Sequence, residues 1–171
     1  MEKISSTRTI HAPRWLCFEM IRNVDVHAAA VPEIHARAES GRQHGSLHLG
    51  EYTEWSARYF RVRFQITMEV TGFDWPVRYD ETNRPGLFRV FRHRYSLMAV
   101  NENQTVLRDQ MEFETGWGWL GRLMDRLILA PRLRRALETR MDHLKAWSED
   151  DSWQYWISEA DVKYLKGQAR V

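Results

Sequence analysis

The apolar positions of residues 118–149 recur at steps of three and four, and charged residues fill most of the positions between them. This period predicts a long amphipathic helix. Its apolar stripe consists of Leu120, Leu123, Met124, Leu127, Ala130, Leu137, Met141 and Leu144. Pro131 lies inside the segment and lacks the N–H that a helix interior requires, so we expect a kink or a break there.

Upstream of this helix, from about residue 35 to residue 115, the apolar period shortens to two, which predicts consecutive antiparallel strands. Alternation begins near Leu47, is clearest over residues 60–70, and returns in a short run over residues 77–81. The last two strands each place every second residue on one face. These faces carry Phe91, His93, Tyr95 and Leu97 on one strand and Leu107, Asp109, Met111 and Phe113 on the other.

The N-terminal residues predict a strand followed by two short helices. Residues 3–11 are rich in β-branched types, and Pro13 suits the first turn of a helix. A second short helix is expected from Asp25 until Pro32 interrupts it. One strand, two short helices, about six strands and a long helix together predict an α+β fold, in which the helix packs on one face of an antiparallel sheet.

Composition limits the class of protein. The 171 residues fit one domain, predicted over residues 1–149, with residues 150–171 as a tail compatible with a short amphipathic helix. One cysteine excludes an internal disulfide and favours the cytoplasm. A net charge of +2 does not indicate a nucleic-acid partner, and no apolar run reaches the roughly 20 residues of a transmembrane segment.

Three stretches carry a resemblance to a known superfamily: residues 86–95 (GLFRVFRHRY), residues 107–116 (LRDQMEFETG), and residues 118–127 (GWLGRLMDRL) with RMDHLK from Arg140. With the order of elements, they resemble the START-like, Bet v 1-like superfamily often labelled SRPBCC, and in particular its bacterial polyketide-cyclase or ligand-binding members. The resemblance covers roughly residues 3–148. It implies a helix-grip fold, in which a curved antiparallel sheet of about seven strands wraps the C-terminal helix and leaves a cavity.

This resemblance implies that the cavity binds a hydrophobic or amphipathic small molecule, lipid-like or polyketide-like. One alternative is a cyclase, aromatase or dehydratase that uses His93 and Asp109. Another is an interaction module with a filled core, since eight tryptophans could close the cavity. The predicted pocket residues are Trp55, Phe64, Ile66, Met68, Tyr79, Phe91, His93, Tyr95, Asp109, Met111, Leu123 and Leu127.

His93 and Asp109 are the main candidates for chemistry, because both have inward parity on strands expected to pair as a hairpin. A buried carboxylate needs a partner, and an imidazole is a suitable one. The pair could act as general acid and base or as a polar anchor for a ligand. It could equally be a structural pair, or Asp109 could reach the mouth of the cavity and be solvated.

The other candidate chemistries have little support, and no cofactor or metal is expected. His44 and His48 lack the spacing of a metal site. Cys17 lies among apolar residues and is expected to be an inert buried thiol. The closely spaced glycines of residues 116–121 follow an antiparallel strand, so they are expected to turn the chain into the helix rather than to bind phosphate.

Two surfaces are candidates for partners. Arg126, Arg132, Arg134, Arg135 and Arg140 predict a basic helical surface, which we interpret as a solvated face, with an anionic lipid or protein partner as the alternative. The tail carries apolar residues at helical spacing, expected to dock on the domain rather than to contact a membrane. These are Trp153, Trp156, Ile157, Ala160 and Tyr164.

Overall fold

The computed structural model describes residues 1–59 and 62–158, whose elements follow the expected order. The strands are β1 (Glu2–Ile10), β2 (Arg37–Gly41), β3 (Tyr52–Tyr59), β4 (Val62–Asp74), β5 (Arg78–Asn83), β6 (Phe88–Asn101) and β7 (Gln104–Thr115). The helices are α1 (Arg14–Arg22), α2 (Val24–Ala29), η1 (Pro32–Ile34), α3 (Gly118–Met124), η2 (Asp125–Leu129), α4 (Ala130–Glu149) and η3 (Asp151–Tyr155).

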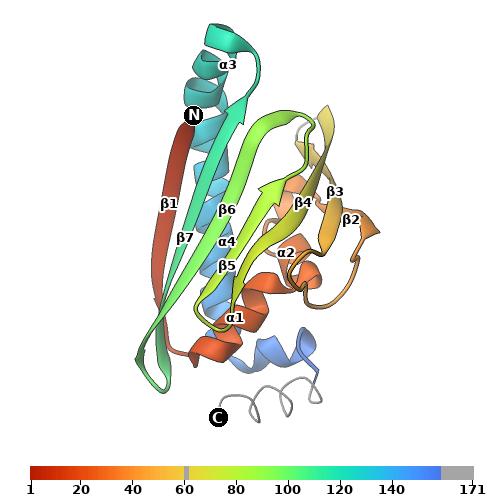
Figure 1. Ribbon diagram of the computed structural model, residues 1–171. Coiled ribbons are helices and arrows are strands. Elements are labelled where there is room, and N and C mark those ends of the chain that lie inside the picture. Colours follow the sequence, from red (N-terminus) through yellow and green to blue (C-terminus); the bar gives the residue numbers. More distant parts are fainter. Residues whose placement is uncertain (60–61, 159–171) are drawn as a thin grey trace.

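The described strands form one antiparallel sheet in the order β1-β7-β6-β5-β4-β3-β2. Each strand from β2 to β6 pairs with the next along the chain, and β1 forms the edge beside β7. The sheet curves along one side of α4, while α1 and α2 lie across one end (Figure 1). The predicted α+β helix-grip arrangement is therefore confirmed.

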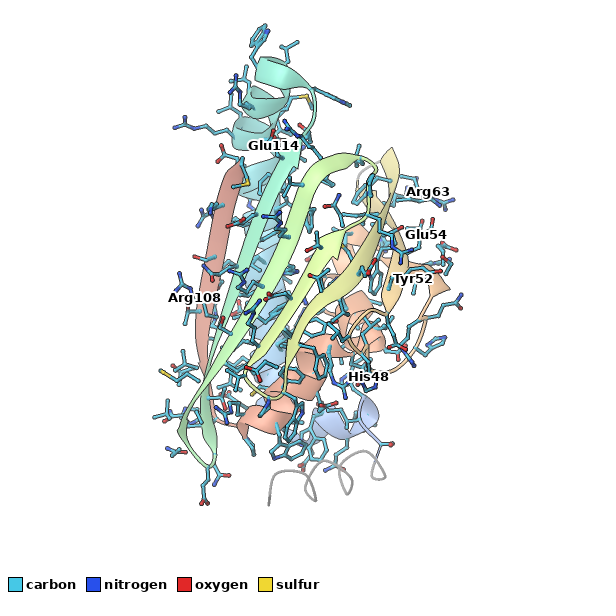
Figure 2. The ribbon with its side chains drawn as sticks, in the orientation of Figure 1. His48, Tyr52, Glu54, Arg63, Arg108 and Glu114 are labelled. Atoms are coloured by element: carbon cyan, nitrogen blue, oxygen red, sulfur yellow. The ribbon has the colours of Figure 1, made fainter. Side chains whose placement is uncertain are left out.

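The two faces of the sheet have the polarity that the alternation predicts. His93, Tyr95 and Leu97 of β6 are buried, as are the four inward residues of β7. The other face is polar and carries ion pairs, such as Lys3 with Glu112 at 2.6 Å. Arg108 and Glu114, on the same face of β7 as Glu112, are labelled in Figure 2. The inward face thus meets α4, and the outward face meets solvent.

The long helix runs from residue 118 to residue 149 with a π-helical segment, η2, between α3 and α4. Pro131 lies in the first turn of α4, and the N–H of Ala130 bonds to the carbonyl of Asp125, five residues back. A wider π turn accommodates the hydrogen bond that proline cannot make and the space its ring needs. The irregularity expected at Pro131 therefore appears in the turn that precedes it.

One expected strand segment is a loop. Alternation suggested a strand from Leu47, but β3 begins at Tyr52. Leu47 instead packs beside α1, where its N–H donates to the carbonyl of Arg22 at 3.0 Å and its carbonyl accepts from Arg22 Nη1 at 2.8 Å. Leu49 is exposed. Tertiary hydrogen bonds to α1 replace the sheet pairing that the local pattern suggested.

The described part of the tail docks on the domain. Trp153 meets Trp15 edge to face with ring centroids 6.3 Å apart, and Trp156 lies 5.3 Å from Trp147. Ile157 is buried in the same cluster. These contacts account for the first part of the predicted stripe, whereas Ala160 and Tyr164 lie outside the described residues.

Candidate ligand-binding cavity

A cavity of about 230 Å³ lies between the inner face of the sheet and α4. Most of its wall is apolar, and its polar residues are two histidines, one glutamate and two arginines. The lining residues are His27, Val31, Ile34, Ala36, Trp55, Ala57, Phe64, Ile66, Met68, Glu81, Leu87, Phe88, Phe91, His93, Met111, Leu129, Arg132, Leu133, Ala136, Leu137 and Arg140. The filled-core alternative expected side chains to close the space between sheet and helix, but a cavity is present there.

The mouth of the cavity lies between the β5–β6 turn and the start of α4. Leu87 and Arg132 are the lining residues that are exposed. The opposite end is formed by Glu81, His93 and Arg140, which are all buried. The cavity therefore runs from a surface-accessible apolar end to a buried polar end.

Seven of the twelve predicted pocket residues line this cavity. They are Trp55, Phe64, Ile66, Met68, Phe91, His93 and Met111. All of them lie on strands, where a period of two determines which face a side chain takes.

Tyr79, Tyr95 and Asp109 do not line the cavity. They have the inward parity that the sequence indicates, but they are fully buried behind the polar end. Tyr79 donates to Glu81 Oε1 at 3.1 Å, and Tyr95 contacts His93. They are neighbours of cavity residues rather than part of its surface.

The prediction for Leu123 and Leu127 is wrong. Both are exposed, at 49% and 63%, and neither lines the cavity. The π-helical turn contains about one extra residue, which rotates the helix face before it by about 100° relative to α4. Gly121 and Asp125 face inward in their place. The regular 3.6-residue period of an α-helix does not predict this rotation.

Four polar lining residues were not predicted: His27, Glu81, Arg132 and Arg140. Glu81 has the same strand parity as Tyr79, so alternation along the strand would have placed it inward. Arg140 was assigned to the basic surface, but only 5% of it is exposed. It lies three residues after Leu137, on the apolar stripe, and this spacing was the available signal.

Arg140, Tyr95, His93 and Asp109 form a buried chain of polar contacts. The guanidinium donates to Tyr95 Oη, and its Nη1 lies 3.4 Å from His93 Nδ1. Tyr95 Oη is 3.0 Å from the same nitrogen. Because a guanidinium can only donate, Nδ1 acts as an acceptor and the ring proton sits on Nε2. Nε2 lies 2.5 Å from Asp109 Oδ1, but the two groups are not aligned as a regular hydrogen bond.

Charge at the polar end is set by burial and by Arg140. Burial raises the pKa of Glu81, although the positive charge of Arg140 opposes the change. Burial works to lower the pKa of Arg140, but interactions with Tyr95, Asp109 and Glu81 outweigh it and the pKa is raised. The site therefore holds a permanent cation beside a carboxyl group that ionises less readily than an exposed one.

His27 forms part of the side wall. Its ring stacks on Trp55 with centroids 4.6 Å apart. Burial, with the positive charge of Arg140 adding to it, places the pKa of His27 well below its usual value. The ring is consequently neutral near pH 7 and contributes an uncharged, flat surface.

The arrangement of these elements is shared with solved structures of other proteins. The Zhui aromatase/cyclase of Streptomyces sp. R1128 has a TM-score of 0.69 and 14% identity, over 86% of this chain and 93% of that one. A protein of Thermus thermophilus has a TM-score of 0.68 and 14% identity, over 85% and 95%. A START superfamily protein of Mycobacterium smegmatis has a TM-score of 0.61 and 12% identity, over 86% and 97%.

The chain has the START-like, Bet v 1-like fold. The likeness is one of structure, because no protein-family model matches the sequence and no curated protein matches it significantly. The resemblance in fold that three short stretches suggested is thereby confirmed.

Two further features of this START-like chain bear on its chemistry. Burial raises the pKa of the Cys17 thiol to about 12, so it remains protonated and is a poor nucleophile. Within residues 1–59 and 62–158, no cluster of three or more His, Cys, Asp or Glu could hold a metal ion. In the same ranges, no helix has the length and apolar character needed to cross a bilayer.

Proposed function

We propose that the chain binds a small apolar or amphipathic molecule in this cavity, with the polar group of the ligand directed toward Arg140. The observation that carries the proposal is a mostly apolar cavity that ends at a buried guanidinium. Binding pockets typically combine an apolar wall with a few polar groups that set orientation.

The contacts of Arg140 indicate which polar group suits it. Among the described residues its hydrogen-bonding contacts are Tyr95 and His93, and no carboxylate lies within ion-pair distance of it. A guanidinium offers five N–H donors and accepts nothing. A carbonyl, carboxylate or hydroxyl oxygen on the ligand would therefore complement it.

The volume restricts the size of the ligand. About 230 Å³ is below the roughly 300–1,000 Å³ of typical small-molecule pockets. A compact ligand fits entirely, while a longer one would extend through the mouth beside Leu87 and Arg132. Burial of its apolar part would contribute roughly 25 cal/mol per Å² before the costs of association.

The test is native mass spectrometry of freshly purified protein, followed by denaturation and identification of any released molecule. Ala136→Phe places a ring at the cavity wall, whereas Ala146→Phe adds the same ring to an exposed position of the same helix. A stoichiometric ligand retained by the second variant and lost from the first supports the proposal. An apo mass, with no thermal stabilisation by fatty acids or polyketide-like aromatics, contradicts it.

A second candidate is a cyclase or dehydratase acting on a bound polyketide-like molecule. Glu81 lines the cavity with a raised pKa, and such a carboxyl group suits general acid catalysis. Both ring nitrogens of His93 are engaged by protein groups, so His93 and Asp109 would position the site while Glu81 exchanges the proton. Glu81→Gln would then abolish turnover while retaining affinity, whereas a pure binding protein would have no turnover to lose.

A further inference from the structure

Residues 117–128, here called the tip segment, expose large apolar side chains. Trp119 is 68% exposed and Leu127 is 63% exposed. The full set of exposed large apolar residues in the segment is Trp117, Trp119, Leu120, Leu123, Met124, Leu127 and Ile128. Such a contiguous set marks an interaction surface, unlike the isolated apolar residues common on protein surfaces.

Specific contacts hold the apolar side of the tip segment outward. Asp125 is buried and accepts hydrogen bonds from Thr115 N at 3.0 Å and Thr115 Oγ1 at 2.8 Å. Gly121 is also buried, and a Cβ there would lie 2.9 Å from Thr115 Oγ1. The small and acidic side of the helix therefore faces β7, and the apolar stripe faces away from the protein.

The exposed charged residues in and shortly after the tip segment are all basic. Arg122 and Arg126 are exposed within the tip segment, and Arg132, Arg134 and Arg135 are exposed shortly after it. Residues 116–135 contain one acidic residue, Asp125, which is buried against Thr115. The exposed surface is consequently apolar and cationic, which complements an apolar and anionic partner.

The tip segment lies at the end of the molecule where the cavity opens. In Figure 1, α3 projects beyond the end of the sheet, and Figure 2 shows side chains extending from it above Glu114. Ile128 is followed directly by Leu129, which lines the cavity, and Leu87 at the mouth is exposed as well. The tip segment therefore leads directly along the chain into the wall of the cavity.

We propose that the tip segment docks on the surface of an anionic lipid bilayer, with its apolar side chains in the interface and Arg122 and Arg126 at the headgroups. Tryptophan and basic residues around an apolar helix face are the composition of interfacial helices. The segment is too short to span a bilayer, because its eleven helical residues, 118–128, extend only about 17 Å against a hydrocarbon core of about 30 Å.

A second copy of the chain fits this surface less well. A two-fold contact would bring Arg122 and Arg126 of each copy close to the same residues of the other, without exposed acids in residues 116–135 to neutralise them. Anionic headgroups neutralise these charges, and the acyl region takes up the tryptophan and leucine side chains. Bilayer docking requires no ligand in the cavity, so it does not rest on the proposed function.

The experiment is flotation of the full chain with phosphatidylcholine vesicles and with vesicles containing about 30% phosphatidylglycerol. We expect binding to the anionic vesicles that weakens as salt is raised, and little binding to phosphatidylcholine alone. Arg122→Ser with Arg126→Ser should weaken the partition constant about thirty-fold. Trp119→Ser with Leu123→Ser and Leu127→Ser should abolish binding.

The matched control is Met98→Ser with Val100→Ser, which removes exposed apolar residues of β6, outside the tip segment. This variant should bind as the original chain does, and circular dichroism should show all variants folded. Absence of binding to anionic vesicles, equal binding to both vesicle types, or equal loss in the control would each overturn the proposal. Self-association of the chain, measured by sedimentation and abolished by the tip substitutions, would overturn it as well. None of these outcomes depends on whether a cavity ligand is found.

Discussion

His93 Nε2 lies 2.5 Å from Asp109 Oδ1, with 3% and 0% of the two side chains exposed. The contact joins β6 to β7 beneath the cavity, and Arg140 and Tyr95 approach the other ring nitrogen. His93 also lines the cavity, whereas Asp109 does not. Asp109 therefore lies behind His93 and does not itself form part of the cavity surface.

Loss of Asp109 should destabilise the fold strongly. Removing one partner of a buried pair leaves the other without compensation, which costs roughly 3–5 kcal/mol. We expect Asp109→Ala to lower the free energy of unfolding by about this amount in urea denaturation. Glu112→Ala on the same strand breaks the exposed pair with Lys3 and should cost about 1 kcal/mol or less. Equal effects of the two substitutions would show that the buried pair has no special structural role.

Glu81 should make stability fall as pH rises. Burial raises the folded-state pKa of Glu81. The stability that this shift adds to the folded state is therefore fully present below the unfolded-state pKa, near 4.3, and is lost as pH rises through the folded-state pKa. Glu81→Gln should remove this loss and be more stable than the original chain above that pKa.

Glu112→Gln provides a control of opposite sign for the Glu81 experiment. The hydrogen bond with Lys3 lowers the folded-state pKa of Glu112. The stability that this shift adds is therefore present above the unfolded-state pKa of Glu112 and is lost as pH falls through the folded-state pKa. Glu112→Gln should therefore lose stability near neutral pH and match the original chain at low pH. Unfolding measured from pH 4 to pH 8 would detect both trends, and parallel curves for Glu81→Gln and the original chain would refute the burial argument.

Two leucines of the predicted helical stripe should differ in their effect on stability. Leu137 is buried, and its replacement by alanine should cost about 2–5 kcal/mol. Leu127→Ala removes an exposed side chain and should change the free energy of unfolding by no more than about 0.5 kcal/mol. A large cost at Leu127 would mean that the stripe before α4 faces inward after all.

Gly121→Ala should destabilise the chain despite the higher helix propensity of alanine, which favours such a change by up to about 1 kcal/mol. The new Cβ would lie 2.9 Å from Thr115 Oγ1 and 3.1 Å from Trp117 Cβ, and overpacking of this kind costs about 1–3 kcal/mol. Gly86→Ala is the control, since its Cβ would meet nothing closer than 3.8 Å. A shift in melting temperature for Gly121→Ala alone would agree with close packing of α3 on Thr115.

The alternation of β6 and β7 was sufficient to predict the inward faces of both strands, including His93 and Asp109. Alternation is reliable here because successive side chains of a strand point to opposite faces, whatever the rest of the fold does. The same reasoning placed Trp55, Ile66 and Met111 on the wall of the cavity.

The helix shows the opposite case. Its period predicted one continuous stripe, but the hydrogen bonds between Asp125 and Thr115 and the π turn around residues 125–129 rotate the first part away from the sheet. Leu123 and Leu127 consequently lie outside the cavity, and Arg140, assigned to a basic surface, lies inside it.

The sequence by itself determined the order of the elements, the α+β fold and the inward faces of the strands, because these follow from local periods of two and of about 3.6 residues. Only the tertiary structure decided which of the inward residues surround the cavity, which helix residues join them and which apolar residues remain exposed. Those outcomes depend on contacts between distant residues, such as Thr115 with Asp125 and Tyr95 with Arg140. A period along the chain carries no information about such contacts, since they form only when the helix lies on the sheet.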